Sequence, residues 1–247
     1  MGPPTFSDTY TVKLIHRQDV AEGTMAFRFE KPVHFVFAPG QFVEIGLVDP
    51  PETDAEGNGR AFSIASAPHE DTLMVATRMR DTAFKRVLRS MPLGATVQME
   101  GPFGNVVLHA DPARPAVLVA GGIGITPFRS MVLHAAAQKL PHRLFLFYSN
   151  RRLEDAPFLD ELQSLQRDNP HYTFVGTMTE PDKSSRPWQG ETGFITPAML
   201  SKVLMNVALQ IFYVVGPPGM VTGLRATLKD AGFDERDIRT EAFTGYS

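Results

Sequence analysis

Arginine, aromatic and hydroxyl side chains alternate in the short run Arg60-Ala61-Phe62-Ser63. In a strand, successive side chains face opposite sides, so Arg60 shares one face with Phe62 and Ala61 shares the other with Ser63. A guanidinium can pair with a diphosphate, an aromatic ring can stack on a flat heterocycle, and a hydroxyl can hydrogen-bond a ring nitrogen. The run indicates either a strand that binds a diphosphate-bearing cofactor or an ordinary barrel strand with an exposed arginine.

A second segment with chemical potential is LVAGGIGITPF, residues 118–128. A buried-strand pattern runs into three glycines that permit positive φ and close approach of a pyrophosphate: Gly121, Gly122 and Gly124. Thr126 is the expected N-cap of a following helix and Pro127 its first residue, and free N–H groups at that helix start would attract an anion. Because the segment departs from GxGxxG, a purely structural glycine turn is the alternative interpretation.

The elements that position these residues fall into two patterns. Residues 10–109 contain short runs rich in β-branched and aromatic residues: YTVKLIHR, TMAFRFE, QFVEIGL, AFSIAS, TLMVATR, TVQMEG and NVVLH. Six or seven such strands predict a small antiparallel barrel. Phe84, Val87 and Leu88 lie at helical spacing after Asp81 or Thr82 as cap, so one helix interrupts the barrel and its start could hold a phosphate.

From about Ala113 strands alternate with helices, which is typical of a parallel α/β sheet. Strands are expected at 116–120, 143–149, 172–177, 210–215 and 238–241. Helices are expected at 127–139, 157–168, 197–205 and 218–231. The segment DPARP at 111–115 predicts an interdomain linker, and residues 179–193 predict a long loop.

Composition excludes several classes of protein. The chain has 247 residues, 43% of them hydrophobic and 21% charged, which suits two globular domains with full cores. The net charge of -3 gives no signal for nucleic acid or anionic membrane. No apolar run is long enough for a membrane span and the start is polar, so a cytoplasmic location is the default. Without cysteine, the chain cannot ligate an iron-sulfur cluster through thiolates, and its seven scattered histidines predict no metal site.

The order of the motifs resembles that of the ferredoxin-NADP reductase superfamily. In that family a flavin motif, Arg-x-Tyr/Phe-Ser, precedes a second phosphate loop and then a glycine-rich nucleotide loop. Seven segments match in order across essentially the whole chain: RAFSIASAP, TRMRDTAFKRVL, GPFGN, VAGGIGITPF, FYSNRR, VVGPPGM and EAFTGY. The resemblance implies an antiparallel β-barrel FAD-binding domain at 1–112, followed by a doubly wound parallel-sheet α/β NAD(P)-binding domain at 113–247.

By this resemblance, Arg60 pairs with the flavin diphosphate, Phe62 stacks on the isoalloxazine and Ser63 lies near flavin N5, with Ala61 in the same cofactor-binding strand. The family's second flavin loop corresponds to a set of residues that follows the fifth barrel strand: Thr77, Arg78, Met79, Thr82 and Ala83. The backbone N–H groups of Thr82 and Ala83 are expected at the pyrophosphate. Arg80 and Asp81 stand where the family often has glycines, and Arg78 and Arg80 could equally be solvated charges.

In the second domain the resemblance implies that residues 121–126 line the nicotinamide nucleotide, with Thr126 near the nicotinamide ring. Four polar residues follow the second strand, where the adenosine ribose lies in doubly wound folds: Ser149, Asn150, Arg151 and Arg152. The two arginines suit a 2′-phosphate and favour NADPH over NADH, unless they are solvent-facing. The loop expected to close over the nucleotide contains Gly216, Pro217 and Met220, with Val215 where plant-type members carry cysteine.

The C-terminal residues Glu241 and Phe243 resemble the family's acidic and aromatic residues beside the flavin. The alternative interpretation is an edge strand with a packed tail. With Ser63 and Thr126, these two residues complete the candidate catalytic set.

The sequence therefore predicts an NAD(P)H-dependent FAD oxidoreductase that passes electrons to a separate carrier such as ferredoxin or flavodoxin. Hydride transfer between two cofactors requires no general acid or base from the protein, only their orientation. Two alternatives are a diaphorase or free-flavin reductase, and a flavin-carrying regulatory or interaction subunit whose nucleotide loop is unused.

Overall fold

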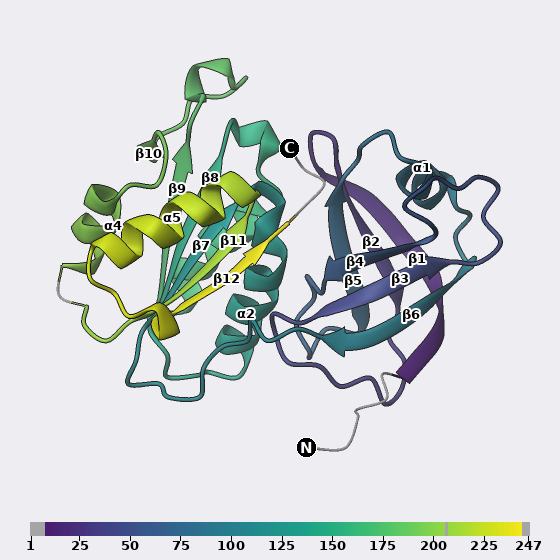
Figure 1. Ribbon diagram of the computed structural model, residues 1–247, viewed down its shortest axis with the longest axis horizontal. Coiled ribbons are helices and arrows are strands. Elements are labelled where there is room, and N and C mark those ends of the chain that lie inside the picture. The colour runs from purple at the N-terminus through teal and green to yellow at the C-terminus, as the bar shows by residue number, and fades with distance from the viewer. Residues whose placement is uncertain (1–7, 206, 244–247) are drawn as a thin grey trace.

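Two six-stranded sheets divide the chain, one antiparallel and one parallel (Figure 1). The computed structural model describes residues 8–205 and 207–243. The first sheet ends at residue 103 and the second begins at residue 116. The domain boundary expected at 112 falls in the segment between them and stays a prediction.

The antiparallel sheet curls into a barrel with strand order β4-β3-β6-β1-β2-β5. Its strands are β1 (Asp8–Ala21), β2 (Thr24–Glu30), β3 (Phe42–Leu47), β4 (Gly59–Ser63), β5 (Thr72–Arg78) and β6 (Thr96–Phe103). Alternate residues such as Val43 and Ile45 of β3 are buried in one core. Helix α1 (Ala83–Ser90) adds Phe84 and Leu88 to that core, and Thr82 is its N-cap, as expected.

The prediction of a seventh barrel strand, NVVLH at 105–109, is wrong, because these residues form no strand. Val106 and Leu108 pack instead against the core of the second sheet. The backbone N–H of His109 donates to the Tyr213 hydroxyl over 2.9 Å. The apolar residues of this run therefore pack between the barrel and the parallel sheet.

The parallel sheet has strand order β10-β9-β8-β7-β11-β12. Its strands are β7 (Ala116–Gly121), β8 (Leu144–Asn150), β9 (Tyr172–Met178), β10 (Glu191–Thr192), β11 (Ile211–Gly216) and β12 (Ile238–Ala242). Its helices are α2 (Ile125–Ala137), α3 (Leu159–Asp168), α4 (Pro197–Leu204) and α5 (Pro218–Asp230). Short 3-10 turns lie at η1 (Gly122–Gly124), η2 (Leu153–Asp155), η3 (Pro181–Lys183) and η4 (Glu235–Asp237).

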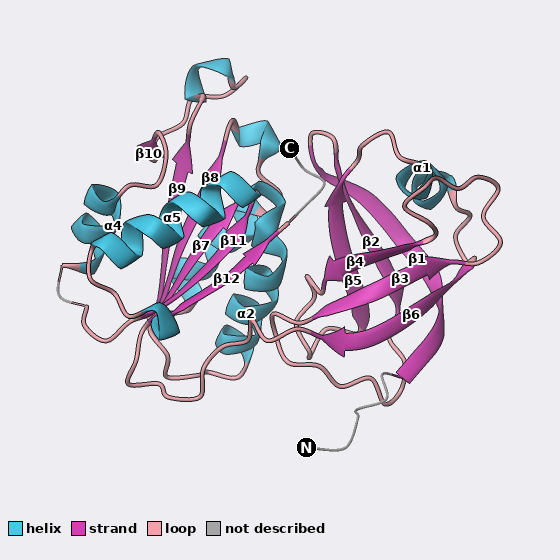
Figure 2. Cartoon of the chain, viewed as in Figure 1, coloured by secondary structure: helices cyan, strands magenta, loops and turns pink. Residues whose placement is uncertain are grey.

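Both faces of the parallel sheet are covered by helices (Figure 2). Helices α2 and α3 share a core with Leu118 and Leu146, whereas α4 and α5 share another with Val117 and Phe145. Successive strand residues thus enter opposite cores, which is why these strands are continuous apolar runs. The doubly wound fold is confirmed. The expected loop at 179–193 also contains the two-residue strand β10, which is too short to leave a pattern in the sequence.

Arg129 of α2 fastens the parallel sheet to the barrel. Its side chain is 5% exposed, and Nη1 donates to the Ala65 carbonyl at 2.7 Å and pairs with Glu70 of the barrel at 3.0 Å. Nη2 lies 2.7 Å from Glu161 of α3. Beside it, the Ser130 hydroxyl donates to the Ser66 carbonyl over 2.7 Å. A buried cation satisfied from both domains holds the two sheets in one relative position.

Within the described ranges, none of the helices combines the length and the apolar character that crossing a bilayer requires.

Candidate functional site

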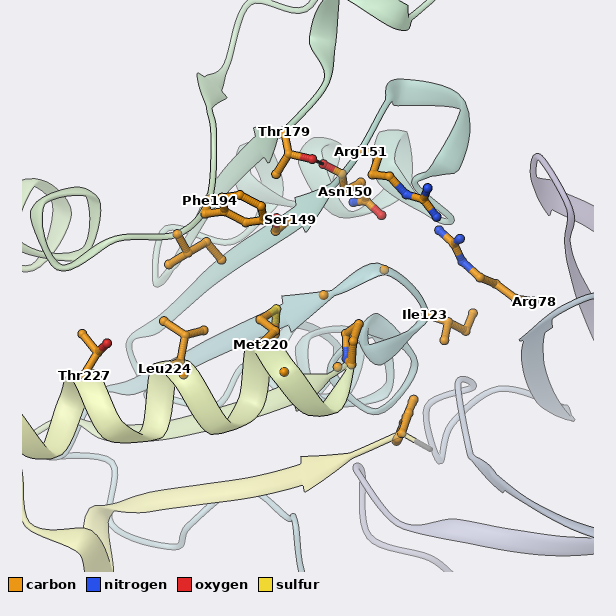
Figure 3. A pocket seen from close by; sticks show the side chains of 18 residues that line it. Arg78, Ile123, Ser149, Asn150, Arg151, Thr179, Phe194, Met220, Leu224 and Thr227 are labelled. Atoms are coloured by element: carbon orange, nitrogen blue, oxygen red, sulfur yellow. Dashed lines mark hydrogen bonds between the residues drawn. The ribbon is translucent and has the colours of Figure 1, made fainter. Parts of the chain in front are cut away.

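A cavity of about 590 Å³ opens at the carboxyl ends of the parallel strands (Figure 3), and we call it the strand-end cavity. Residues at or just beyond the ends of β7, β8 and β11, together with the first turn of α5, form much of its wall. They include most of the expected nucleotide-binding residues: Gly121, Gly122, Ser149, Asn150, Arg151, Gly216, Pro217 and Met220. Open parallel sheets bind ligands in this crevice, where the connections of neighbouring strands leave in opposite directions.

Two arginines from different domains reach the strand-end cavity. Arg78 ends β5 of the barrel, and its Nη2 lies 3.8 Å from the position that a β-carbon on Gly122 would occupy. Arg151 follows β8, and Figure 3 shows its guanidinium pointing toward that of Arg78. The sequence assigns Arg78 to the flavin loop, whereas the structure directs its side chain into the nucleotide crevice. Paired guanidinium groups can hold a phosphate bidentately.

Arg152 has a different environment from Arg151. Its Nη2 lies 3.0 Å from Glu22 of the barrel and 2.9 Å from Asp155. The hydrogen bonds to Asp155 raise the pKa of Arg152 above its usual value. Arg152 does not belong to the wall of the strand-end cavity. Its pair with Glu22 joins the two domains, whereas Arg151 lines the strand-end cavity.

The glycine turn differs in detail from its expected conformation. Only Gly122 has a positive φ, of 54°, whereas φ is -114° at Gly121 and -60° at Gly124. Gly124 is required for another reason, since a β-carbon there would lie 2.4 Å from the Val215 carbonyl oxygen. The backbones of β11 and the turn approach each other too closely for any side chain.

The expected N-cap at Thr126 and helix start at Pro127 are wrong. Helix α2 begins at Ile125 with Gly124 as N-cap, because the 3-10 turn η1 already winds the chain before the threonine. The Thr126 hydroxyl donates to the Ile123 carbonyl over 3.0 Å, and Thr126 is 1% exposed. Pro127 stays within the first turn, where backbone N–H groups have no helical partner. Neither residue lines the strand-end cavity.

A second cavity of about 550 Å³ lies on the barrel beside β4 and α1, and we call it the barrel cavity. It brings together most of the expected flavin-binding residues with the C-terminal strand: Arg60, Ala61, Phe62, Ser63, Thr82, Glu241 and Phe243. Thr77 is fully buried and Met79 packs on the barrel core, and neither lines the cavity. Phe62 is 5% exposed and lies 5.8 Å from the Phe84 ring, so only a small part of its ring is open for stacking.

Ser63 carries an unsatisfied polar atom at the wall of the barrel cavity. Its residue is 6% exposed, and its buried Oγ has no hydrogen-bond partner. A buried hydroxyl without a partner is costly, so such an atom marks a position where a ligand supplies the missing hydrogen bond. The heterocyclic nitrogen of a flavin fits this requirement. At the same cavity, burial raises the pKa of the Glu241 carboxyl.

Cationic groups gather at the other side of the barrel cavity. Lys85 is 8% exposed, and its pKa falls to about 8 because of burial and of the nearby positive charges of Arg80 and Arg60. Such a concentration of positive charge beside a helix N-terminus suits a diphosphate. The sequence analysis missed Lys85, although its position three residues after Thr82 places it one helical turn from the cap.

Phe243 lines both cavities. Strand β12 ends on the side of the parallel sheet that faces the barrel (Figure 1), and the Phe243 backbone N–H donates to the Gly216 carbonyl over 2.9 Å. Phe243 is therefore common to the walls of the two cavities. Other wall residues that the sequence did not single out are Phe42, Ala76, Thr179, Phe194 and Leu224.

A doubly wound sheet whose strand-end crevice faces a cavity on an antiparallel barrel defines a two-domain nucleotide-binding fold of the ferredoxin-NADP reductase type. The model of the oxidoreductase NAD-binding domain family matches residues 118–226. The chain is similar to ferredoxin-NADP reductases in fold, and its second domain matches the NAD-binding family in sequence.

Similar solved structures share this fold across nearly the whole chain. The Amycolatopsis cytochrome P450 reductase GcoB superposes with a TM-score of 0.81 at 23% identity, over 98% of this chain and 71% of that one. The ferredoxin NADP+ reductase from Neisseria gonorrhoeae, with bound FAD and NADP, gives 0.79 at 22% identity, over 95% and 98%.

Similar curated proteins include a reductase subunit and a protein of a hydroxylase system. The glycine betaine monooxygenase reductase subunit of Chromohalobacter salexigens is 28% identical over 223 residues, 89% of this chain. The phenol hydroxylase P5 protein of Acinetobacter pittii is 26% identical over 238 residues, 95% of this chain. The chain spans 60% and 65% of the length of these two relatives.

Proposed function

We propose that the chain is an FAD-dependent NAD(P)H oxidoreductase, with FAD in the barrel cavity and the nicotinamide nucleotide in the strand-end cavity. The observation that carries this proposal is that Phe243 lines both cavities, which makes them neighbours. Hydride transfer requires the reacting atoms of both cofactors within about 3 to 3.5 Å, and two cavities that meet can provide this approach. Bound flavin would accept the hydride and release its electrons one or two at a time.

The roles of the flavin-binding residues follow from their places around the barrel cavity. Arg60, Thr82 and Lys85 would hold the diphosphate, and Ser63 would hydrogen-bond the flavin ring. Glu241 lines the same cavity, and its raised pKa suits a carboxyl that can hold a proton near the ring. Phe243 would cover the ring until a nicotinamide displaces it.

The roles of the nucleotide-binding residues follow from the strand-end cavity. The turn at Gly121 and Gly122 would approach the pyrophosphate, and Arg78 and Arg151 would supply positive charge from two sides. Arg151 follows the strand at which doubly wound folds bind the adenosine ribose, which favours NADPH over NADH.

The proposed electron acceptor is a separate carrier protein of the ferredoxin or flavodoxin type. This part of the proposal is supported by the curated relative that is the reductase subunit of a glycine betaine monooxygenase. A cytoplasmic location stays a prediction from the sequence.

Anaerobic stopped-flow mixing of FAD-loaded protein with NADPH or NADH tests the central claim. Prompt loss of flavin absorbance is expected, and faster loss with NADPH would support the coenzyme assignment. The proposal is overturned if the protein retains no FAD or if its bound flavin stays oxidised. Bound flavin that stays oxidised favours the alternative function, a flavin-carrying regulatory subunit. Reoxidation by ferricyanide and free flavin, but by no purified carrier, would point to the diaphorase.

A further inference from the structure

Three carboxylates in the loop before β4 are bound to arginines of β4 and α1. Glu52, Asp54 and Glu56 alternate in sequence, and a turn closed by the Gly57 N–H and the Asp54 carbonyl follows Asp54. Glu52 lies 2.6 Å from Arg86, and Glu56 lies 2.9 Å from Arg60. We call residues 52–56 the acidic strap.

Asp54 makes the contacts that matter most. Its Oδ1 accepts from Arg60 Nη2 over 3.2 Å, and its Oδ2 accepts from the Ala83 backbone N–H over 3.0 Å. Ala83 is the first residue of α1, an eight-residue helix. One carboxylate thus bridges a guanidinium and a helix N-terminus, as two oxygens of a phosphate group would.

The rest of the Arg60 guanidinium is also engaged by the loop. Nη1 donates to the carbonyl oxygens of Glu56, Gly57 and Gly59 over 3.0, 2.9 and 2.7 Å. The residue that lines the barrel cavity and best suits a diphosphate is therefore bound to the protein's own backbone and carboxylates.

We propose that the acidic strap is an internal ligand, in which Asp54 occupies the diphosphate position of the flavin-free protein and has to leave before FAD binds. This inference rests on the proposed function, since it concerns the same cavity. The apparent affinity for FAD is then the intrinsic affinity multiplied by the fraction of molecules whose strap is open. The strap also lowers the repulsion among Arg60, Lys85 and Arg80 while the cavity holds no anion.

The test measures binding of FAD and of ADP, a diphosphate without a flavin ring, to flavin-free protein. In Asp54→Asn, the carboxylate charge is lost with little change in shape. We expect association of FAD to become faster and Kd to fall by at least about threefold for both ligands, because the competing anion is gone. The matched control is Asp49→Asn, which removes the same charge from an exposed residue of the same loop, with φ of 42° that asparagine tolerates. No change is expected for the control.

A second measurement needs no variant. The Glu56 backbone N–H donates to Asp54 Oδ1 over 3.0 Å, and that of Gly57 donates to the Asp54 carbonyl over 3.0 Å. Hydrogen exchange at these two amides should become faster when FAD or ADP binds, since the strap opens. Exchange at Ala83 should stay slow, because a phosphate oxygen replaces the carboxylate.

The outcomes separate the two proposals. Equal FAD and ADP binding by wild type and Asp54→Asn, or unchanged exchange at residues 56 and 57, overturns the internal ligand and leaves the flavin function intact. Tighter ADP binding by Asp54→Asn without any FAD binding supports the internal ligand and removes the flavoprotein assignment. Absence of binding for both ligands in both proteins overturns both.

Discussion

The backbone N–H of Phe243 donates to the carbonyl oxygen of Gly216 over 2.9 Å, which ties the residue after β12 to the glycine at the end of β11. The hydrogen bond holds the Phe243 side chain where the walls of the two cavities join. An aromatic ring at that place shields whatever lies in the barrel cavity from the strand-end cavity.

Phe243→Ala should expose the flavin. We expect faster reoxidation by oxygen and an altered rate of hydride transfer, with unchanged FAD content, because the diphosphate contacts lie elsewhere in the barrel cavity. Phe243→Tyr keeps a ring and serves as the control. Truncation after Thr240 should act like the alanine variant; it also removes residues 244–247, which lie outside the described residues. Stopped-flow rates of flavin reduction and reoxidation test this prediction. Unchanged rates in both directions would show that the Phe243 ring does not shield the flavin.

Arg60→Ala should weaken FAD retention. A diphosphate would lose a charge-assisted partner worth roughly 1.5 to 3 kcal/mol, which is about a tenfold or greater rise in Kd. Arg89→Ala, at the exposed end of α1, is the matched control and should bind FAD normally. Fluorescence titration of flavin-free protein measures both; full retention by Arg60→Ala would remove this arginine from the site.

Arg151→Ala should discriminate between coenzymes. If Arg151 binds the 2′-phosphate, KM for NADPH rises by about tenfold or more while KM for NADH changes little. Arg152→Ala lacks this selectivity, because its guanidinium is held by Glu22 and Asp155. Steady-state kinetics with both coenzymes test the pair, and the assignment fails if the Arg151 variant affects them equally.

Lys85 should make FAD binding depend on pH. Its pKa is lowered from 10.5 to about 8, so the side chain loses its charge as pH rises through that value, and Kd for FAD should increase between pH 7 and 9. Lys85→Met should bind more weakly at pH 7 and show a flatter profile. An identical profile in both proteins would contradict the assignment.

The lowered pKa of Lys85 also makes the free energy of unfolding depend on pH. Between pH 8 and 10.5 the unfolded chain binds more protons at Lys85 than the folded chain does, so this residue makes the free energy of unfolding increase with pH there. Denaturant unfolding of flavin-free wild type and Lys85→Met across that range measures the contribution.

Arg129→Met should destabilise the contact between the sheets. Removing the cation takes the ion pair from Glu161 and leaves Glu70 with the more distant Arg28. We expect the free energy of unfolding to fall by about 2 to 4 kcal/mol, below the fully buried limit since Glu161 is 40% exposed. Arg225→Ala breaks an exposed pair with Glu235 and should lower the free energy of unfolding much less. Urea unfolding measures the free energy of unfolding of both variants. Equal losses would show that the buried ion pairs of Arg129 stabilise the protein no more than an exposed pair does.

The sequence predicts the parallel sheet closely because strands such as 116–121 are apolar on both faces and have glycine at their ends. Ser63 and Phe243 are predicted at the flavin site by motif resemblance, and the structure brings them to one cavity. That Arg78 reaches the strand-end cavity could not be predicted, since it depends on how the parallel sheet packs on the barrel. The role of Asp54 could not be predicted from the sequence either. It depends on a contact with the backbone N–H of Ala83, which is distant in sequence.

The contacts of Arg129 also bear on the timing of turnover. A swing of one domain away from the other would separate this guanidinium from Glu70 and the Ala65 carbonyl and leave it paired with Glu161 of its own domain. Each such swing loses the contacts of Arg129 with the barrel, so these contacts favour one fixed distance between the two cavities. Catalytic cycles in this architecture would be paced by arrival and departure of the nucleotide rather than by opening and closing of a hinge.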